Sequence, residues 1–470
     1  MKLIEEINNN QKIIPMKTTI KVIALFISIL LLSINTLAKK PKCGAHLLHA
    51  IITKKDPSWF SKQTAKRQAA QINYQNKQGA FMKTTAQVTI PVVYHIVLNQ
   101  NQINAIGGTA GIQKRIDSQM IVINRDYGRR NADSTTIPSA FKARYANTGI
   151  QFCLAHRKPD GTATSGADII TLPNTTKLIE ETNINGQDLF YDTKFTNGAF
   201  NTWDPSKYLN IWVCNASMGN DTNGILGLTV PPYFPSSFGY DPNEVGVILN
   251  YRAWGKRSTG FEPYISGCDK GRTLSHELGH FFNLEHIWGD DNGACPGDAG
   301  YTDDGINDTP IQGAENYGCP TFPSVSCTAS APNGDMFMNY MDYSDDICLT
   351  MFTPGQVAVM QAEVSSTGES YSLTQNNNVC YWPASVANTQ GATTIEIVPN
   401  PFSHQININY AEQPLAIRLI NTLGAIVFEM DKTSIGTNTT LINTTPLTSG
   451  IYYLQVQFKE AMQTHKIIKE

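Results

Sequence analysis

The sequence lacks an excess of basic charge and is poor in charged residues of either sign. Its 36 Lys and Arg are outweighed by 39 Asp and Glu, which gives a net charge of −3 and a pI of about 6.3. Dedicated nucleic-acid-binding proteins are usually basic, so this balance argues against that class. Charged residues make up 16% and hydrophobic residues 41%, a composition that permits a packed core and argues against global disorder.

A long uniform helical architecture is also disfavoured. The chain contains 35 Gly and 24 Pro together with many Asn and Thr, which indicates frequent turns and β-structure rather than a helical bundle or coiled coil. Because domains average roughly 150 residues, a length of 470 predicts two or three of them.

The N-terminal apolar run is too short for a transmembrane helix. Residues 22–32 form a run of 11 residues, whereas a bilayer span needs about 20. Lysines precede the run, and small residues follow at 36–38, where a signal peptidase could cleave. We therefore expect residues 1–38 to be a signal peptide, with Met16 as a candidate true start, and no transmembrane span. An uncleaved anchor is the alternative.

Charge is distributed unevenly along the chain. Residues 39–86 carry ten Lys and Arg but one acid, a net charge of +9, and residues 1–38 add +2. Because the whole chain carries −3, residues 87–470 carry −14. A basic leader thus precedes an acidic body, and opposite charges attract. We predict that residues 39–86 are a propeptide held on the body.

Nine cysteines suit an exported protein. In an oxidising compartment eight can pair and one is left over. Cys43 lies alone in the basic leader, so it is the natural odd one. An ordinary disulfide is the alternative for Cys43. The others are Cys153, Cys214, Cys268, Cys295, Cys319, Cys327, Cys348 and Cys380.

Residues 276–286 carry the chemistry and run His-Glu-Leu-Gly-His-Phe-Phe-Asn-Leu-Glu-His. In a helix, His276 and His280 lie about 40° apart on one face, with Glu277 beside them. Two imidazoles one turn apart and an adjacent carboxylate suit a zinc hydrolase, and His286 can supply a third ligand if the chain turns. A helix with surface histidines is the alternative, although this pattern arises by chance in about one such chain in ten thousand.

The motif resembles the extended signature of the metzincins, which has Gly where this chain has Asn283. Asn tolerates positive φ better than most residues, so we expect the turn toward His286 to be kept with some strain. Residues 338–348 run Met-Asn-Tyr-Met-Asp-Tyr-Ser-Asp-Asp-Ile-Cys and narrow the resemblance to the pappalysin family of metzincins. The resemblance extends from about Gln87 to Gln361.

The resemblance implies the roles of several residues. Glu277 would be the general base of a zinc endopeptidase whose metal is held by the three histidines. Met341 would be the methionine under the zinc site, or a plain core residue, and Tyr343 would stabilise the oxyanion. Asp346 would form the bottom of the pocket that binds the residue after the scissile bond. A carboxylate at this place implies cleavage before Arg or Lys. Alternatively, Asp346 binds backbone or calcium. Cys43-Gly44 resembles the cysteine switch of related zymogens.

Six Asp and no Lys or Arg stand between Gly289 and Thr309. Such a cluster repels itself unless a hard cation neutralises it, and the segment resembles the calcium-binding segment of the family. Asp298, Asp308 and Thr309 are the candidate calcium ligands, and a solvated acidic loop is the alternative. The same resemblance implies the disulfides Cys295–Cys327 and Cys319–Cys348, whereas the partners of the other four body cysteines stay open.

The tail is expected to be a separate module. Residues 383–393 are predicted to be a linker, and residues 394–470 show the alternating pattern of a small β-sandwich. The segments 399–402, 447–454 and 466–469 resemble, in that order, the sorting domain of the type IX secretion route in Bacteroidetes. The alternative is a generic immunoglobulin-like binding module.

We therefore expect an α+β protein: a metzincin-type catalytic domain at 87–382, with a twisted mixed sheet and a zinc helix, followed by an all-β immunoglobulin-like sandwich. The predicted protein is a secreted or surface-attached zinc endopeptidase made as a zymogen, with protein or peptide substrates and the type IX secretion machinery as partners. A surface adhesin that keeps a metal site without cutting is the rival. A zinc hydrolase acting on a non-protein amide is a third possibility.

Overall fold

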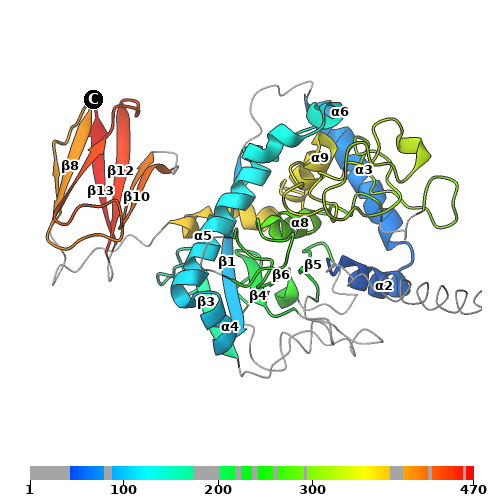
Figure 1. Ribbon diagram of the computed structural model, residues 1–470, viewed down its shortest axis with the longest axis horizontal. Helices are drawn as coiled ribbons and strands as arrows, with labels where there is room; N and C mark the ends of the chain where they lie inside the picture. Colours follow the sequence, from blue (N-terminus) through cyan, green and yellow to red (C-terminus); the bar gives the residue numbers. More distant parts are fainter. Residues whose placement is uncertain are drawn as a thin grey trace, which may run out of the picture. The chain divides into compact units, whose positions relative to one another are not determined.

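The computed structural model describes two compact units, Met1–Pro383 and Ala384–Glu470 (Figure 1). The predicted signal peptide and the predicted linker lie outside the residues that it describes. Within those residues, no helix combines the length and apolarity that crossing a membrane requires. The described ranges are 43–78, 87–172, 202–216, 224–234, 242–257, 262–289, 294–381, 395–421, 426–458 and 462–470.

The first unit is built on a six-stranded mixed sheet. Five strands follow the order β2-β1-β4-β6-β5, and the sixth, β3, pairs with the C-terminal half of β1. All pairings are parallel except that of β5 with β6. Because β5 is an edge strand, the main-chain N–H and C=O groups on its outer side can pair with another extended segment. The strands are β1 (Val88–Asn99), β2 (Ile150–Leu154), β3 (Ala167–Leu172), β4 (Leu209–Cys214), β5 (Gly227–Val230) and β6 (Gly246–Asn250).

Helices accompany this sheet in both the leader and the body. The α-helices are α2 (Ala45–Lys55), α3 (Trp59–Gln78), α4 (Gln100–Ala105), α5 (Gly108–Tyr127), α6 (Ser139–Lys142), α8 (Arg272–Phe281) and α9 (Pro354–Glu363). Short 3-10 helices lie at Ala132–Thr136, Pro242–Glu244, Thr328–Ser330, Tyr371–Gln375 and Asn377–Cys380.

Helices α5 and α8 pack together over one face of the sheet. Leu274, Leu278 and Phe281 of α8 join the apolar residues of β1, β4 and β6 in the main core. Since a helix repeats every 3.6 residues, the side of α8 that carries His276 and His280 faces away from this core. Every residue of α8 is buried, so the helix is fixed on all sides.

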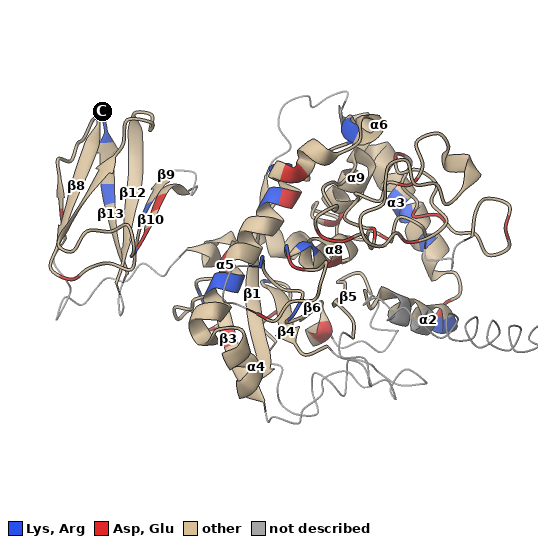
Figure 2. Cartoon of the chain, in the orientation of Figure 1, with Lys and Arg blue, Asp and Glu red and all other residues tan. Residues whose placement is uncertain are grey.

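The leader is folded against the body. Leu48 and Ile52 of α2 pack on the opposite face of the sheet, with Leu228, Trp212 and Ile248. Helix α3 lies against α9 and carries basic side chains (Figures 1 and 2). Both elements fall within the predicted propeptide.

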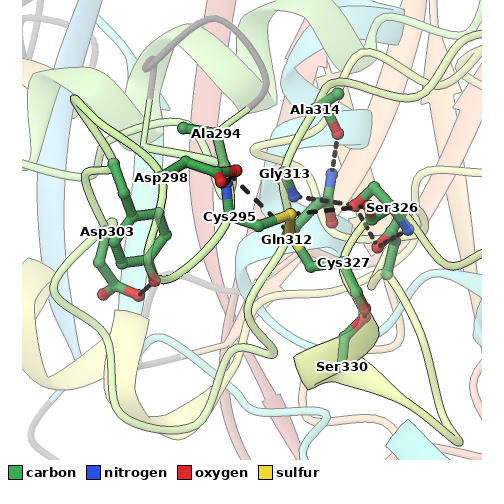
Figure 3. The surroundings of a disulfide bond; sticks show 12 residues. Ala294, Cys295, Asp298, Asp303, Gln312, Gly313, Ala314, Ser326, Cys327 and Ser330 are labelled. Carbon is green, nitrogen blue, oxygen red and sulfur yellow. Dashed lines mark hydrogen bonds between the residues drawn. A yellow bond between two sulfur atoms is a disulfide. The ribbon is translucent and has the colours of Figure 1, made fainter.

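Three disulfides connect the described cysteines. Cys295–Cys327 and Cys319–Cys348 are the two pairs that the family resemblance implies, and Figure 3 shows the surroundings of the first. The third, Cys153–Cys380, ties β2 to the end of the first unit across 227 residues. Six cysteines are therefore paired rather than the expected eight, and Cys43, Cys214 and Cys268 lie outside the disulfides.

The second unit is an antiparallel β-sandwich. Its sheets are β10-β9-β12-β13 and β11-β8-β7. Ile408 of one sheet and Leu419, Leu454 and Ile467 of the other share a single core. The expected α+β class with an all-β tail is confirmed. The strands are β7 (Ile395–Val398), β8 (Gln405–Tyr410), β9 (Ala416–Asn421), β10 (Ile426–Asp431), β11 (Thr439–Asn443), β12 (Gly450–Gln457) and β13 (Met462–Lys469).

The segment that contains Met341 packs directly on α8. A Cβ atom built on Gly279 would lie 2.3 Å from the Met341 sulfur, and Met341 is fully buried. Such a distance is far inside van der Waals contact, so a side chain at position 279 would displace the sulfur. Glycine is therefore required at this helical position by its neighbour rather than by its backbone angles.

We predict that Gly279→Ala lowers the free energy of unfolding. Alanine normally stabilises a helix interior by about 0.5–1 kcal/mol over glycine, but overpacking a core costs about 1–3 kcal/mol. Thermal unfolding of the single variants and of Gly279→Ala/Met341→Ala measures the coupling between the two positions. The alanine should be less harmful once the sulfur is removed. A Gly279→Ala single variant that is more stable than the parent would contradict this packing argument.

Candidate active site

The three histidines of the motif converge. The Nε2 atoms of His276, His280 and His286 lie 3.1–3.2 Å from one another. His276 Nδ1 lies 2.7 Å from the Tyr340 carbonyl oxygen, and His280 Nδ1 lies 2.8 Å from the Leu284 carbonyl oxygen. Because a carbonyl only accepts, both rings carry their proton on Nδ1 and turn the lone pair of Nε2 toward the common centre.

This donor set fits zinc. Tetrahedral zinc with bonds of about 2.0–2.1 Å to nitrogen sets its ligand nitrogens about 3.3–3.4 Å apart, close to the separations observed. Burial, together with the neighbouring His280 and His286, holds the pKa of His276 well below its usual value, so its ring stays neutral and able to bind a metal. The inward-facing lone pairs of His276 and His280 repel each other unless a cation lies between them.

Asn283 forms the turn that brings the third histidine back to the helix. Its φ is 68°, in the left-handed region, as the sequence led us to expect. Its side chain is buried and donates from Nδ2 to Glu363 Oε1 at 2.9 Å. Beyond the turn, the Trp288 indole stacks on the ring of His286, with centroids 4.4 Å apart and planes within 5°. Hydrogen bonding and stacking thus fix the turn and the third ring.

Glu277 lies beside the cluster and is completely buried. One carboxylate oxygen, Oε2, lies 2.7 Å from the hydroxyl of Thr229 on β5. The other, Oε1, accepts no hydrogen bond of normal geometry from the described residues. Burial raises the pKa of Glu277 to about 7, although the Thr229 hydroxyl and the Cys43 thiol act in the opposite direction. A carboxyl group with such a pKa can take and release a proton near neutral pH.

Cys43 of the leader completes the cluster. Its sulfur and the ligand nitrogens of the three histidines all lie within 4.8 Å of one another, and all four residues are buried. The Tyr343 hydroxyl donates to the Cys43 carbonyl oxygen at 3.4 Å, and the Tyr343 ring lies 4.8 Å from the ring of His286. The structure therefore brings together the candidate zinc ligands, base, tyrosine and leader cysteine.

A cavity of about 550 Å³ opens next to this cluster. Glu277, Tyr343 and Asp346 contribute to its lining. Asp346 is buried, and its Oδ2 accepts the main-chain N–H groups of Lys270 and Arg272 at 2.7 and 3.2 Å. Burial raises the pKa of Asp346 to about 7, against the effect of these two amides. Asp346 therefore accepts the main-chain N–H of the first residue of α8 as well as lining the cavity.

The candidate calcium ligands are engaged elsewhere. Asp298 Oδ2 accepts the main-chain N–H of Cys295 at 2.8 Å (Figure 3). Asp308 accepts from Thr353 and Gly355, and the Thr309 hydroxyl donates to Asp304. In the described part of the chain, the histidine–cysteine cluster is where three or more His, Cys, Asp or Glu ligands meet. Calcium binding stays a prediction from the sequence.

Sequence reasoning missed several residues of the site. Thr229 and Gly227 contact Glu277 from β5, and Trp288 supports His286. Arg67 of the leader donates to Asn283 and forms an ion pair with Glu285, at 3.3 and 3.1 Å. A basic residue in a basic leader gives no signal of its own, and Thr229 follows no recognisable spacing.

Solved structures of mirolysin resemble this chain. A mature Tannerella forsythia mirolysin in complex with a cleaved peptide is 37% identical, with a TM-score of 0.53, covering 63% of this chain and 100% of that one. A Tannerella forsythia promirolysin mutant is 34% identical, with a TM-score of 0.55, covering 72% of this chain and 98% of that one. The likeness thus includes a precursor form.

Sequence comparisons agree. An extracellular metalloprotease of Arthroderma gypseum is 45% identical over 93 residues, 20% of this chain and 29% of that protein, so the match spans less than a third of its length. The profile of the Pregnancy-associated plasma protein-A family matches residues 192–365, and that of the secretion system C-terminal sorting domain matches residues 396–470. Together with the mirolysin likeness, these matches show that the chain belongs to the pappalysin family of secreted metalloproteases and ends in a sorting domain.

Proposed function

We propose that this protein is a zinc endopeptidase that is made in a latent form and cleaves peptide bonds with Glu277 as general base. The observation that carries the proposal is the convergence of three imidazole nitrogens and a buried carboxyl group beside a cavity of about 550 Å³. An adhesin that only kept a metal would need the histidines but not a carboxyl group with a raised pKa next to them.

Each group of the site would have a different role in peptide hydrolysis. Zinc, when bound by the three imidazoles, supplies a Lewis acid that activates water and polarises the peptide carbonyl. Glu277 takes a proton from the attacking water on Oε1 and passes it to the leaving amine. The Tyr343 hydroxyl donates to the oxyanion, a contribution of about 2.7–4 kcal/mol in a comparable site. That hydroxyl already donates to a carbonyl of the leader.

The contact of the leader with β5 supports a mode of binding for the substrate main chain. The Gly44 N–H donates to the Gly227 carbonyl oxygen of β5 at 2.7 Å. A Cβ at Gly44 would lie 2.8 Å from the Leu228 side chain, so the leader passes this edge closely. Extended peptides commonly bind by adding to an exposed sheet edge. A substrate that replaces the leader would therefore pair with β5.

Asp346 supports a preference for Arg or Lys immediately after the scissile bond. Its carboxyl group lines the cavity next to the histidines, and burial disfavours its charged form. A cationic side chain in the cavity would compensate that cost. Asp345, its neighbour, also lines the cavity and adds to its acidic character.

The leader supports latency at two places. The Cys43 sulfur lies within 4.8 Å of the ligand nitrogens of the three histidines, where it would exclude the catalytic water. Twenty-four residues later, buried Arg67 pairs with Glu285, which is also 3.2 Å from His49. Although burial opposes it, the charges of Arg67 and His49 hold the pKa of Glu285 well below its usual value. The attraction expected between leader and body thus takes the form of specific ion pairs.

Export supplies the setting for this activity. The sorting-domain match implies the type IX secretion machinery as a partner, and release or surface attachment as the outcome. A leader that keeps the site blocked until export is complete would protect the cell from its own protease.

A peptide-library digest tests the endopeptidase activity. The 39–470 form, treated with trace trypsin to remove the leader and then with a trypsin inhibitor, should produce cuts that a zinc chelator abolishes. Glu277→Ala should bind zinc but lose at least about 99% of turnover, because general-base catalysis is worth 10²–10⁴-fold. Mass spectrometry identifies the cuts. An absence of chelator-sensitive cuts would favour the adhesin.

Asp346→Asn should abolish the preference for Arg and Lys while the fold is retained. Asparagine keeps an oxygen that can accept the amides at the N-terminus of α8, but it cannot offer a full negative charge. The digest is compared between the parent, Asp346→Asn and the adjacent control Asp345→Asn. If the basic preference persists in Asp346→Asn and disappears in Asp345→Asn, the residue that selects Arg or Lys is Asp345 rather than Asp346.

Cys43→Ala should produce a precursor that is active, or that digests itself, without trypsin. Removing the thiol opens the position beside the histidines. Cys268→Ala is a matched control, because Cys268 lines the same cavity outside the disulfides. Activity of both untreated precursors is followed with a fluorogenic peptide. Equal latency of the two variants would remove Cys43 from the role.

A further inference from the structure

Strand β5 contacts the base as well as the leader. In a strand, alternate residues face opposite sides, so Gly227 and Thr229 point one way and Leu228 the other. Leu228 packs with the leader helix α2, whereas Thr229 contacts Glu277 on α8. A Cβ on Gly227 would lie 2.5 Å from Glu277 Oε1, so the absence of a side chain there makes room for the carboxyl group.

The Thr229 hydroxyl is directed at a single residue. It lies 2.7 Å from Glu277 Oε2 and 2.9 Å from the Glu277 main-chain oxygen, and Thr229 is 4% exposed. Its register partner on β6 is the apolar Val247. A buried hydroxyl costs free energy unless it is hydrogen bonded, and valine would fill the same volume without that cost. Packing alone therefore does not explain threonine at this position.

The two acceptors belong to the same residue. The Thr229 hydroxyl lies within hydrogen-bonding distance of both the side-chain Oε2 and the main-chain oxygen of Glu277. One buried hydroxyl on β5 therefore sets the position of the Glu277 carboxyl group relative to the Glu277 backbone. The second oxygen, Oε1, lies on the side of Gly227, where a side chain would leave it no room.

We propose that Thr229 is a positioning residue that holds the Glu277 carboxyl group in register with the strand that binds the substrate main chain. This inference rests on the proposed function. Because Gly227 binds the leader main chain two residues away, one rigid strand sets the position of both the peptide and its base. Small displacements of a catalytic group can cost 10²-fold in rate, so the hydroxyl matters although it touches no substrate atom.

Thr229→Val and Thr229→Ser test the proposal in the activated protein. Valine keeps the shape and removes the hydroxyl, whereas serine keeps the hydroxyl and removes a methyl group. We expect Thr229→Val to lower kcat about 10- to 100-fold with KM within about twofold, and Thr229→Ser to recover most of kcat. A role in packing alone would predict the reverse order, because serine then loses contacts that valine retains.

Two further readouts separate positioning from damage to the metal site. Zinc content, by atomic absorption, should be one per chain in both variants. The affinity of a synthetic peptide of residues 43–50, by calorimetry, should be unchanged because its main-chain contact is with Gly227. Unchanged kcat in Thr229→Val would overturn this inference, provided that Glu277→Ala is inactive. Full activity of Glu277→Ala would instead overturn the proposed function itself.

Discussion

Three buried imidazoles whose Nε2 atoms lie 3.1–3.2 Å apart impose the main constraint on this structure. Imidazole nitrogens this close to one another do not gather unless the surrounding protein holds the rings. Here carbonyl oxygens of Tyr340 and Leu284 fix two rings, and the Trp288 indole supports the third. The completely buried helix α8 and the turn at Asn283 also hold the three rings in place.

The leader contacts the elements that meet this constraint. Cys43 reaches the rings themselves, and Gly44 pairs with the edge strand β5. Arg67, 1% exposed, contacts Asn283 and Glu285 in the turn before His286. Exposed ion pairs contribute little to stability, but breaking a buried pair leaves an uncompensated charge. This difference explains how a short leader can be held firmly on the body.

Strand β5 contacts both the leader and helix α8. Its main chain accepts a hydrogen bond from Gly44, and its Thr229 side chain contacts Glu277. A four-residue strand can do both because its main-chain groups lie in the plane of the sheet, whereas its side chains stand above and below that plane. The cavity shares a residue with helix α8, since Asp346 both lines the cavity and accepts the main-chain N–H of Arg272, the first residue of the helix.

Local spacing and family likeness were enough to predict four features: the histidine motif on a helix, the acidic body with its basic leader, the α+β class and the all-β tail. Thr229 contacts Glu277 across 48 residues, Arg67 contacts Glu285 across 218, and Cys153 bonds to Cys380 across 227. These long-range contacts could not be predicted from the sequence. Helical periodicity relates residues one turn apart, whereas contacts between distant segments depend on how sheet and helices pack and leave no periodic signal in the sequence.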